Sequence, residues 1–231
     1  MKKIITLTLV VFAALSNGAF AQCNEFYQIN EGSNWELETY NAKGKLSGRN
    51  QQHVTQYTKT GDGFNTTINS IMFNEKGKEL MNGNLEMKCA GGTIYIDMRN
   101  FIPEQQLKNM GSYEMTIESE NLEIPSKLTI GETLKDGSIN MTATNSPLPM
   151  KMTVNITDRK VEGKESITTP AGTFDCYKIS SKANFKNQMG VTMNFQFSSI
   201  EWLAPKVGIV KSESYDKNGK MNGYTILTKR N

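Results

Sequence analysis

The strongest constraint on the fold is an alternation of apolar and polar residues that recurs along the chain. In "GVTMNFQFS" at 190–198, Val, Met and the two Phe residues alternate with Thr, Asn, Gln and Ser. "MKMTVNIT" at 150–157, "TIYIDM" at 93–98 and "SYEMTIES" at 112–119 repeat the pattern. Successive side chains of a strand point to opposite faces, so each segment predicts a strand with one buried and one solvated face. One-sided burial is typical of antiparallel sheets around one core, so we expect an all-β chain.

A short phrase occurs three times between these segments, as "YNAKGKL" from Tyr40, "FNEKGKE" from Phe73 and "YDKNGKM" from Tyr215. It could be a repeated phosphate-binding loop or a repeated turn. A phosphate loop needs the G-x-x-x-x-G-K-[ST] arrangement opening a helix, and none follows here. Asn or Asp followed by Gly suits a hairpin turn that ends in the left-handed region. We therefore predict three hairpin tips, with positive φ at Gly44, Gly77 and Gly219.

Two other segments carry weaker signals. Pro103 to Met110 is the one plausible helix, because Pro suits the first helical position and Gly111 follows the last. Glu120 to Thr133 lacks clean periodicity and is expected to be a long connection across the sheet.

The first 21 residues are typical of a secretory signal peptide. Lys2 and Lys3 precede an apolar run, and Ala19-Phe20-Ala21 forms a small-x-small cleavage site. A lipid anchor at Cys23 is disfavoured, because Gln22 stands where a small residue normally precedes a lipidated Cys. We expect a single domain over residues 22–231, exported to the periplasm or outside the cell. No later apolar run reaches 18 residues, so no transmembrane segment is expected after signal cleavage.

The charge balance argues against two classes of partner. The chain has 26 Lys and Arg against 23 Asp and Glu, and two of the lysines belong to the signal peptide. The exported part is therefore nearly neutral, which gives no electrostatic reason to expect nucleic acid or an anionic membrane as partner.

Three cysteines enter an oxidising compartment, which suggests one disulfide and one remaining thiol. Cys176 lies in the β-prone stretch "TFDCYKI" and is expected to be a small buried hydrophobe. We predict that Cys23 pairs with Cys89. Such a bridge closes a long loop and would contribute roughly 4 kcal/mol in chain-entropy models.

Few residues offer catalytic chemistry. His53 is the single histidine and lies in the polar segment "RNQQHVTQYTK", so it is expected to be exposed and not catalytic. The cysteines have no C-x-x-C spacing for zinc. Ser214 opens an S-x-x-K sequence, but it ends a strand where the penicillin-recognising motif opens a helix. We predict no catalytic residue, no metal and no cofactor, and therefore no enzyme.

Long stretches of the chain resemble a known family. "VEGKESITTPAGTFDCYKIS" at 161–180 and "EWLAPKVGIVKSESYDKNGK" at 201–220 are similar to small exported bacterial proteins often labelled TapB-like. "SKLTIGETLKDGSI" and "ITDRKVEGKE" extend the similarity. The resemblance implies an open, strongly curved β sheet or barrel in the cell envelope. The family has no established catalytic residues, so the resemblance implies a fold and a location but no mechanism.

The methionines are the most informative candidates for a binding site. Twelve of the thirteen lie outside the signal peptide. They could fill gaps in the core, form an adaptable apolar cavity, or bind Cu(I) at Met150-x-Met152, although no His or Cys cluster supports copper. Aromatic residues could likewise be core or line the mouth of a half-closed barrel. Our candidate ligand-binding residues are Met152, Met193, Phe195, Phe197 and Trp202.

Two functional hypotheses follow. The first is an envelope protein that binds a lipophilic molecule or peptide in the concave face of its sheet. The alternative is a scaffold protein that docks to an envelope complex through an edge strand, with Leu46 to Lys59 as the candidate edge. A dry cavity of about 300 Å³ or more would favour the ligand.

Overall fold

The computed structural model describes residues 26–27, 29–102, 113–146, 150–189 and 191–231. The helix expected from Pro103 to Met110 lies outside these residues. The described helical structure is one 3-10 turn, η1 (Met98–Phe101). Within the described residues, no helix is long and apolar enough to cross a bilayer.

Thirteen antiparallel strands form one nearly closed, barrel-shaped sheet, which confirms the all-β prediction. The strands are β1 (Asn34–Asn41), β2 (Leu46–Thr60), β3 (Gly63–Asn74), β4 (Glu79–Ala90), β5 (Thr93–Ile96), β6 (Met115–Glu120), β7 (Leu122–Pro125), β8 (Gly137–Ala143), β9 (Met150–Thr169), β10 (Gly172–Met189), β11 (Val191–Ala204), β12 (Gly208–Asp216) and β13 (Met221–Arg230).

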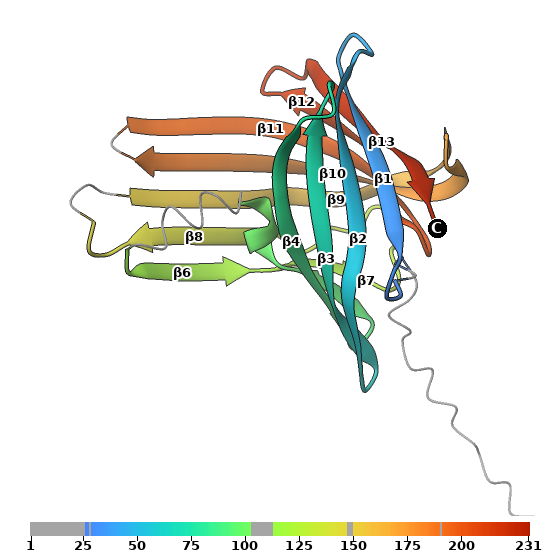
Figure 1. Ribbon diagram of the computed structural model, residues 1–231, viewed down its shortest axis with the longest axis horizontal. Helices are drawn as coiled ribbons and strands as arrows, with labels where there is room; N and C mark the ends of the chain where they lie inside the picture. Colours follow the sequence, from blue (N-terminus) through green and yellow to red (C-terminus); the bar gives the residue numbers. More distant parts are fainter. Residues whose placement is uncertain (1–25, 28, 103–112, 147–149, 190) are drawn as a thin grey trace, which may run out of the picture.

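The order of strands across the sheet is β6-β8-β9-β10-β11-β12-β13-β1-β2-β3-β4-β5-β7. Figure 1 shows β6, β8, β9, β10 and β11 running across β1 to β4, so the curved sheet packs against itself as two layers. β1 and β13 pair in the middle of the order, although they come from opposite ends of the described chain. The two outer strands of the sheet, β6 and β7, are separated in sequence by Asn121 alone.

The alternation predicted from sequence sets the buried face of the long strands. In β9, Met150, Met152, Val154 and Ile156 are buried while the residues between them are not. One core cluster fills the space between the two layers and includes Phe64, Ile68, Val161, Ile179 and Leu203. A second lies on the inner face of β8 to β10 and includes η1, Met141, Met152 and Val154.

The three repeated phrases are hairpin tips, as predicted. Gly44, Gly77 and Gly219 have φ values of 72°, 78° and 77°. In each tip the side chain that begins the turn accepts two backbone N–H bonds of 2.8–3.1 Å; these side chains belong to Asn41, Asn74 and Asp216. The side-chain bonds and the Gly backbone together account for the repeat without any ligand.

Three expectations from the sequence are wrong. The segment Leu46 to Lys59 is not a free edge, because β2 pairs with β1 on one side and β3 on the other. The connection expected at Glu120 to Thr133 contains the short strand β7, which pairs with β5. The start of β11 alternates but does not bury its apolar face: Val191, Met193 and Phe195 are 75%, 48% and 58% exposed.

Candidate functional site: a cavity between the two layers

A cavity of about 330 Å³ lies on the inner side of the curved sheet. Its wall is mostly apolar, with side chains from Trp35, Leu37, Ile68, Leu85, Met87, Ile96, Phe101, Val207, Ile209 and Leu227. Among the strands that run across β1 to β4, β11 contributes Glu201 to the wall. The strand register brings neighbouring side chains of this wall together. Leu37 lies opposite Leu227, and Ile68 lies opposite Leu85, so each pair presents adjacent side chains to one face.

A second hollow of about 390 Å³ adjoins the first, because Leu85 and Asn100 line both. Its wall includes Met72, Met81 and Ile102 and is more polar, with Asn50 and Ser70. Ser70 donates a hydrogen bond of 3.0 Å to Asn50. The inner face of the sheet is therefore mostly apolar around the cavity and carries both polar and apolar side chains toward the second hollow.

Glu201 is the one acidic side chain among the described residues that line the cavity. It lies on β11 opposite Ile179 of β10 and Ser212 of β12, and Ile179 belongs to the core between the layers. Burial raises the pKa of the Glu201 carboxyl, and the positive charge of Arg159 opposes that shift. The Glu201 side chain is therefore partly buried and remains part of the cavity wall.

Tyr27 enters the cavity wall from the segment before β1, where it forms an isolated bridge with Val207. Its ring requires Gly208: a Cβ at that position would lie 2.3 Å from a Tyr27 ring carbon, and Gly208 has a φ of 90°. Burial, with a smaller contribution from the charge of Glu201, raises the pKa of the Tyr27 phenol above its usual value. Tyr27 therefore keeps its hydroxyl proton at neutral pH and can donate a hydrogen bond.

Arg159 is the charged group that acts on Glu201, from strand β9, which lies two strands from β11 in the sheet. It follows Asp158, whose φ is 53°, in an irregular part of β9 and β10. Its Nη1 donates to the carbonyl oxygens of Glu123 and Lys135 at 3.0 Å and 2.6 Å. Burial lowers the pKa of the Arg159 guanidinium, and nearby carboxylates oppose that shift. Its hydrogen bonds thus fix the β7–β8 connection to β9.

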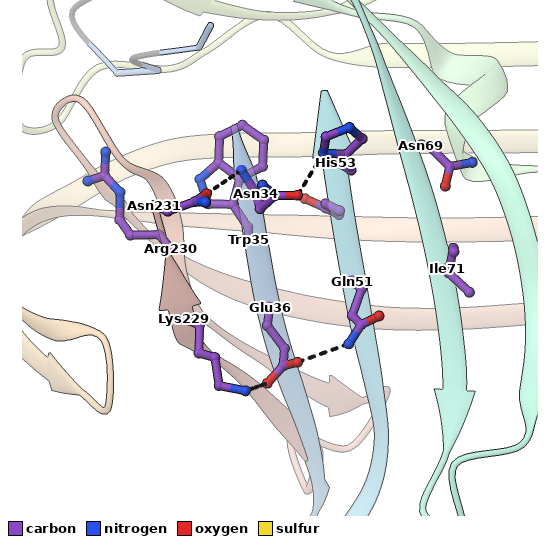
Figure 2. A pocket seen from close by; sticks show the side chains of 11 residues that line it. Asn34, Trp35, Glu36, Gln51, His53, Asn69, Ile71, Lys229, Arg230 and Asn231 are labelled. Carbon is purple, nitrogen blue, oxygen red and sulfur yellow. Dashed lines mark hydrogen bonds and ion pairs between the residues drawn. The ribbon is translucent and has the colours of Figure 1, made fainter. Parts of the chain in front are cut away.

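A shallower groove of about 470 Å³ on the other face of β1 to β3 has a different character (Figure 2). Glu36 accepts a hydrogen bond of 3.1 Å from Gln51 and forms an ion pair of 3.0 Å with Lys229. Asn34 is bonded to His53 and to Asn231. These polar groups already bond one another, and His53 is exposed, so the described residues of the groove present no convergent set of unpaired polar groups.

The family model described as DUF3108-like matches residues 30–227. The chain belongs to the DUF3108-like family.

Two solved structures share the fold of this DUF3108-like chain. A candidate exported protein with a YmcC-like fold from Bacteroides fragilis is 23% identical, with a TM-score of 0.70, and the match covers 90% of this chain and 100% of the other. A candidate lipoprotein from Parabacteroides distasonis is 24% identical, with a TM-score of 0.73 and coverage of 91% and 100%. No curated protein matches the sequence.

Four of the five predicted site residues share one face of the DUF3108-like sheet. Met152 and Met193 flank Asn187 in one cross-strand row, and Phe195 and Phe197 occupy the next two rows on the same face. Their burial differs, however. Met152 is 6% exposed within the second core cluster, whereas Met193 and Phe195 are largely exposed. Phe197 stacks on Phe185 with ring centres 5.6 Å apart.

Trp202 does not join the other four. It is an odd number of residues from Phe197 along a regularly paired part of β11, so its side chain lies on the opposite face. There it is 4% exposed and packs in a third cluster with Cys176 and Val210. None of the five predicted residues is among the described residues that line the 330 Å³ cavity.

The cavity residues that sequence reasoning missed include Glu201 and Tyr27. A signal for Glu201 was present, because it continues the phase of Phe195 and Phe197 toward Leu203, which is a core residue. An acidic residue in the inward phase of an alternating strand indicates either a buried pair or a cavity. Tyr27 had no such signal, because it lies outside any strand.

The cysteines are only partly described. Cys176 is a free, buried thiol, as predicted, and Cys89 is buried at the end of β4. Cys23 lies outside the described residues, so its pairing with Cys89 stays a prediction. In the part of the chain that the structure describes, no cluster of three or more His, Cys, Asp or Glu could hold a metal ion.

Proposed function

We propose that this protein is an exported, non-catalytic envelope protein that binds a lipophilic molecule or an apolar peptide segment in the inner cavity. The observation that carries the proposal is the cavity itself. Its volume of about 330 Å³ falls within the ordinary range of ligand sites, and its wall is apolar with a few convergent polar groups. The residues that line this cavity differ from those expected from the sequence, but Met193, Phe195 and Phe197 lie on the same face of β11 as the cavity residue Glu201.

Export rests on the signal peptide expected at residues 1–21 and on the relatives, which are described as a candidate exported protein and a candidate lipoprotein. Residues 22–231 then form the single exported domain, in the periplasm or outside the cell. The TapB-like label fits this location and belongs to the same proposal.

The test is binding of N-phenyl-1-naphthylamine, a neutral lipophilic dye that fluoresces in apolar sites. We expect micromolar or tighter affinity, about −8 kcal/mol. Leu85→Lys should abolish binding, because Leu85 lines both hollows. Leu80→Lys is the matched control, since Leu80 lies on the same strand and is 62% exposed. Absence of dye binding, or equal loss in both variants, would refute the proposal.

A second candidate function is docking of an extended peptide segment of an envelope protein by strand addition. It is favoured by residues 191–196 of β11, which pair with β10 on one side, while pairing with β12 begins only at Phe197. This edge carries no charge, and Met193 and Phe195 are exposed on it. Charges on edge strands normally prevent such pairing. Lys at both positions should abolish capture of a partner strand without unfolding the domain.

A further inference from the structure

We infer that the cavity selects amphiphiles that carry a protonated amine at the head, with Glu201 as the group that binds the amine. This inference rests on the proposed function, because it names the class of ligand that the same cavity takes. Three observations carry it: the cavity wall has an acidic but no basic side chain, Glu201 has no bonding partner among the described side chains, and aromatic rings line the same wall.

The described cavity wall has one acidic side chain and no basic one. Its polar side chains are Glu201, Tyr27, Gln52, Asn100 and Ser212, and none of the lining residues is Lys, Arg or His. An anionic head would therefore meet the Glu201 carboxyl, with no basic side chain on the wall to receive it. A cationic head would meet its complement, and a charge in an apolar site needs such a partner.

In the described ranges, the Glu201 carboxyl has no hydrogen bond or ion pair with another side chain, whereas Glu165 has both and Glu213 has an ion pair. Arg159 lies close enough to act on it electrostatically. The described hydrogen bonds of the Arg159 guanidinium go to the carbonyls of Glu123 and Lys135. The carboxyl of Glu201 thus has unused acceptor capacity on the cavity side of β11.

Aromatic rings complete the environment that an ammonium group prefers. Tyr27, Trp35 and Phe101 line the same cavity. A cation near the face of an aromatic ring is attracted by the negative face of the ring, and the attraction is stronger when water is excluded. A carboxylate with several aromatic rings therefore favours an amine over a hydroxyl head, because a hydroxyl gains only a hydrogen bond. The apolar wall from Leu85, Met87 and Ile96 is left for the hydrocarbon chain.

The experiment compares three ligands of equal chain length: dodecylamine, dodecanol and dodecanoate, each below its aggregation concentration. Their affinities are measured by displacement of N-phenyl-1-naphthylamine from the full exported chain at neutral pH. We expect dodecylamine to bind at least about tenfold more tightly than dodecanol, and dodecanoate to bind most weakly. Glu201→Gln should reduce the preference for the amine to less than about twofold.

Glu213→Gln is the matched control, because Glu213 lies on the neighbouring strand β12 opposite Ile200 and thus on the other face. It should keep the amine preference. The inference is overturned if dodecylamine binds no more tightly than dodecanol to the unmodified protein. This comparison does not depend on whether any variant folds. It is also overturned if a folded Glu201→Gln protein keeps the preference. If the dye and all three amphiphiles fail to bind, the proposed function itself fails; if the alcohol matches the amine, only the head-group inference fails.

Discussion

The indole N–H of Trp202 donates a hydrogen bond of 2.7 Å to Oε1 of Glu165, across the intervening strand β10. Lys178 forms an ion pair of 3.3 Å with the same carboxylate, and the ammonium of Lys211 lies 4.4 Å from the centre of the indole ring. The hydrogen bond from Trp202 and the lysine charge keep the pKa of Glu165 below its usual value, although partial burial opposes them. Trp202 is thus fixed on the face opposite the cavity, whereas Trp35 lines the cavity.

These two tryptophans are the only ones in the chain and give a direct test of where a ligand binds. In Trp202→Phe, which retains Trp35, dodecanol should shift the fluorescence emission to shorter wavelength, because the alkyl chain replaces water beside the ring. In Trp35→Phe, which retains Trp202, the same addition should leave the emission unchanged. A shift confined to the protein that retains Trp202 would place the ligand on the other face.

Met152 and Met193 lie in the same cross-strand row, so equal substitutions at the two positions separate core from surface. Met152→Lys should lower the free energy of unfolding by several kcal/mol, because Met152 is 6% exposed and the ammonium would have no partner. Met193→Lys should change it by less than about 1 kcal/mol, because Met193 is 48% exposed. Urea denaturation measures both. Unfolding of Met193→Lys would show that the exposed end of β11 is covered in solution.

The positive φ of the hairpin tips can be tested without any contact effect. A Cβ at Gly77 or at Gly163 would meet no atom within 4 Å, but only Gly77 has a positive φ, of 78°. Gly77→Val should therefore lower the free energy of unfolding by about 1 kcal/mol or more. Gly163→Val should change it by less than about half of that, because Val is favoured in strands. Equal effects in thermal or urea denaturation would rule out backbone conformation as the cause.

The cysteines should differ in reactivity. Burial, followed by the charges of Asp175 and Glu165, raises the pKa of the Cys176 thiol to about 11. At pH 8 its thiolate fraction should be roughly a hundredfold below that of an ordinary thiol, so alkylation should be slow until the chain unfolds. Non-reducing peptide mapping should recover Cys23 joined to Cys89. A Cys89–Cys176 peptide, or fast labelling of folded Cys176, would contradict the assignment.

Glu201 should make stability depend on pH in a defined direction. The folded state raises the pKa of its carboxyl, mainly through burial, so the folded state holds this proton more strongly than the unfolded chain. Below the ordinary pKa of Glu, the carboxyl is protonated in both the folded and the unfolded state, so it does not lower the free energy of unfolding. As the pH rises toward the folded pKa, stability is lost, because the unfolded chain ionises more readily.

Glu201→Gln removes this loss. The variant should match the unmodified protein near pH 4 and become more stable at pH 7 to 8, by an amount that urea denaturation across the pH range would show. The positive charge of Arg159 favours ionised Glu201 and therefore reduces the expected gain in stability. Glu201→Gln also removes one of the carboxylates that stabilise the charge of Arg159. A difference that is constant with pH, or that grows toward acid, would show that Glu201 is not desolvated.

The alternation in the sequence predicted which face of each strand is buried, and this held for β9 along its first eight residues. It could not predict where along a strand the second layer crosses, because that depends on the curvature of the whole sheet. The candidate residues 193–197 and the cavity residue Glu201 therefore lie on the same face of β11, at opposite ends. Continuing the phase to Glu201 would have identified an acidic residue that faces inward.

The misassignment of β2 has a related cause. Its polar composition looked like solvation on both faces of an edge strand, but Gln52 lines the cavity and Asn50 bonds Ser70 on the inner side. From the sequence alone, polar residues on the inner face of the sheet could not be distinguished from the polar residues of an exposed edge strand. Strand β7 was missed because four residues that end in Pro125 are too short to show a period.

The pairing of β1 with β13 also governs when the fold can be completed. Nearly two hundred residues separate partners such as Trp35 and Arg230, whereas most other neighbours in the sheet are joined by short hairpins. Loop closure of that length is slow, so β2 to β4 and β9 to β12 can form as local hairpin units before β1 has its second partner. Until then β1 has an unpaired edge. A chain that emerges N-terminus first from the ribosome or a translocation channel must keep that edge away from other chains until β13 has emerged and paired with it.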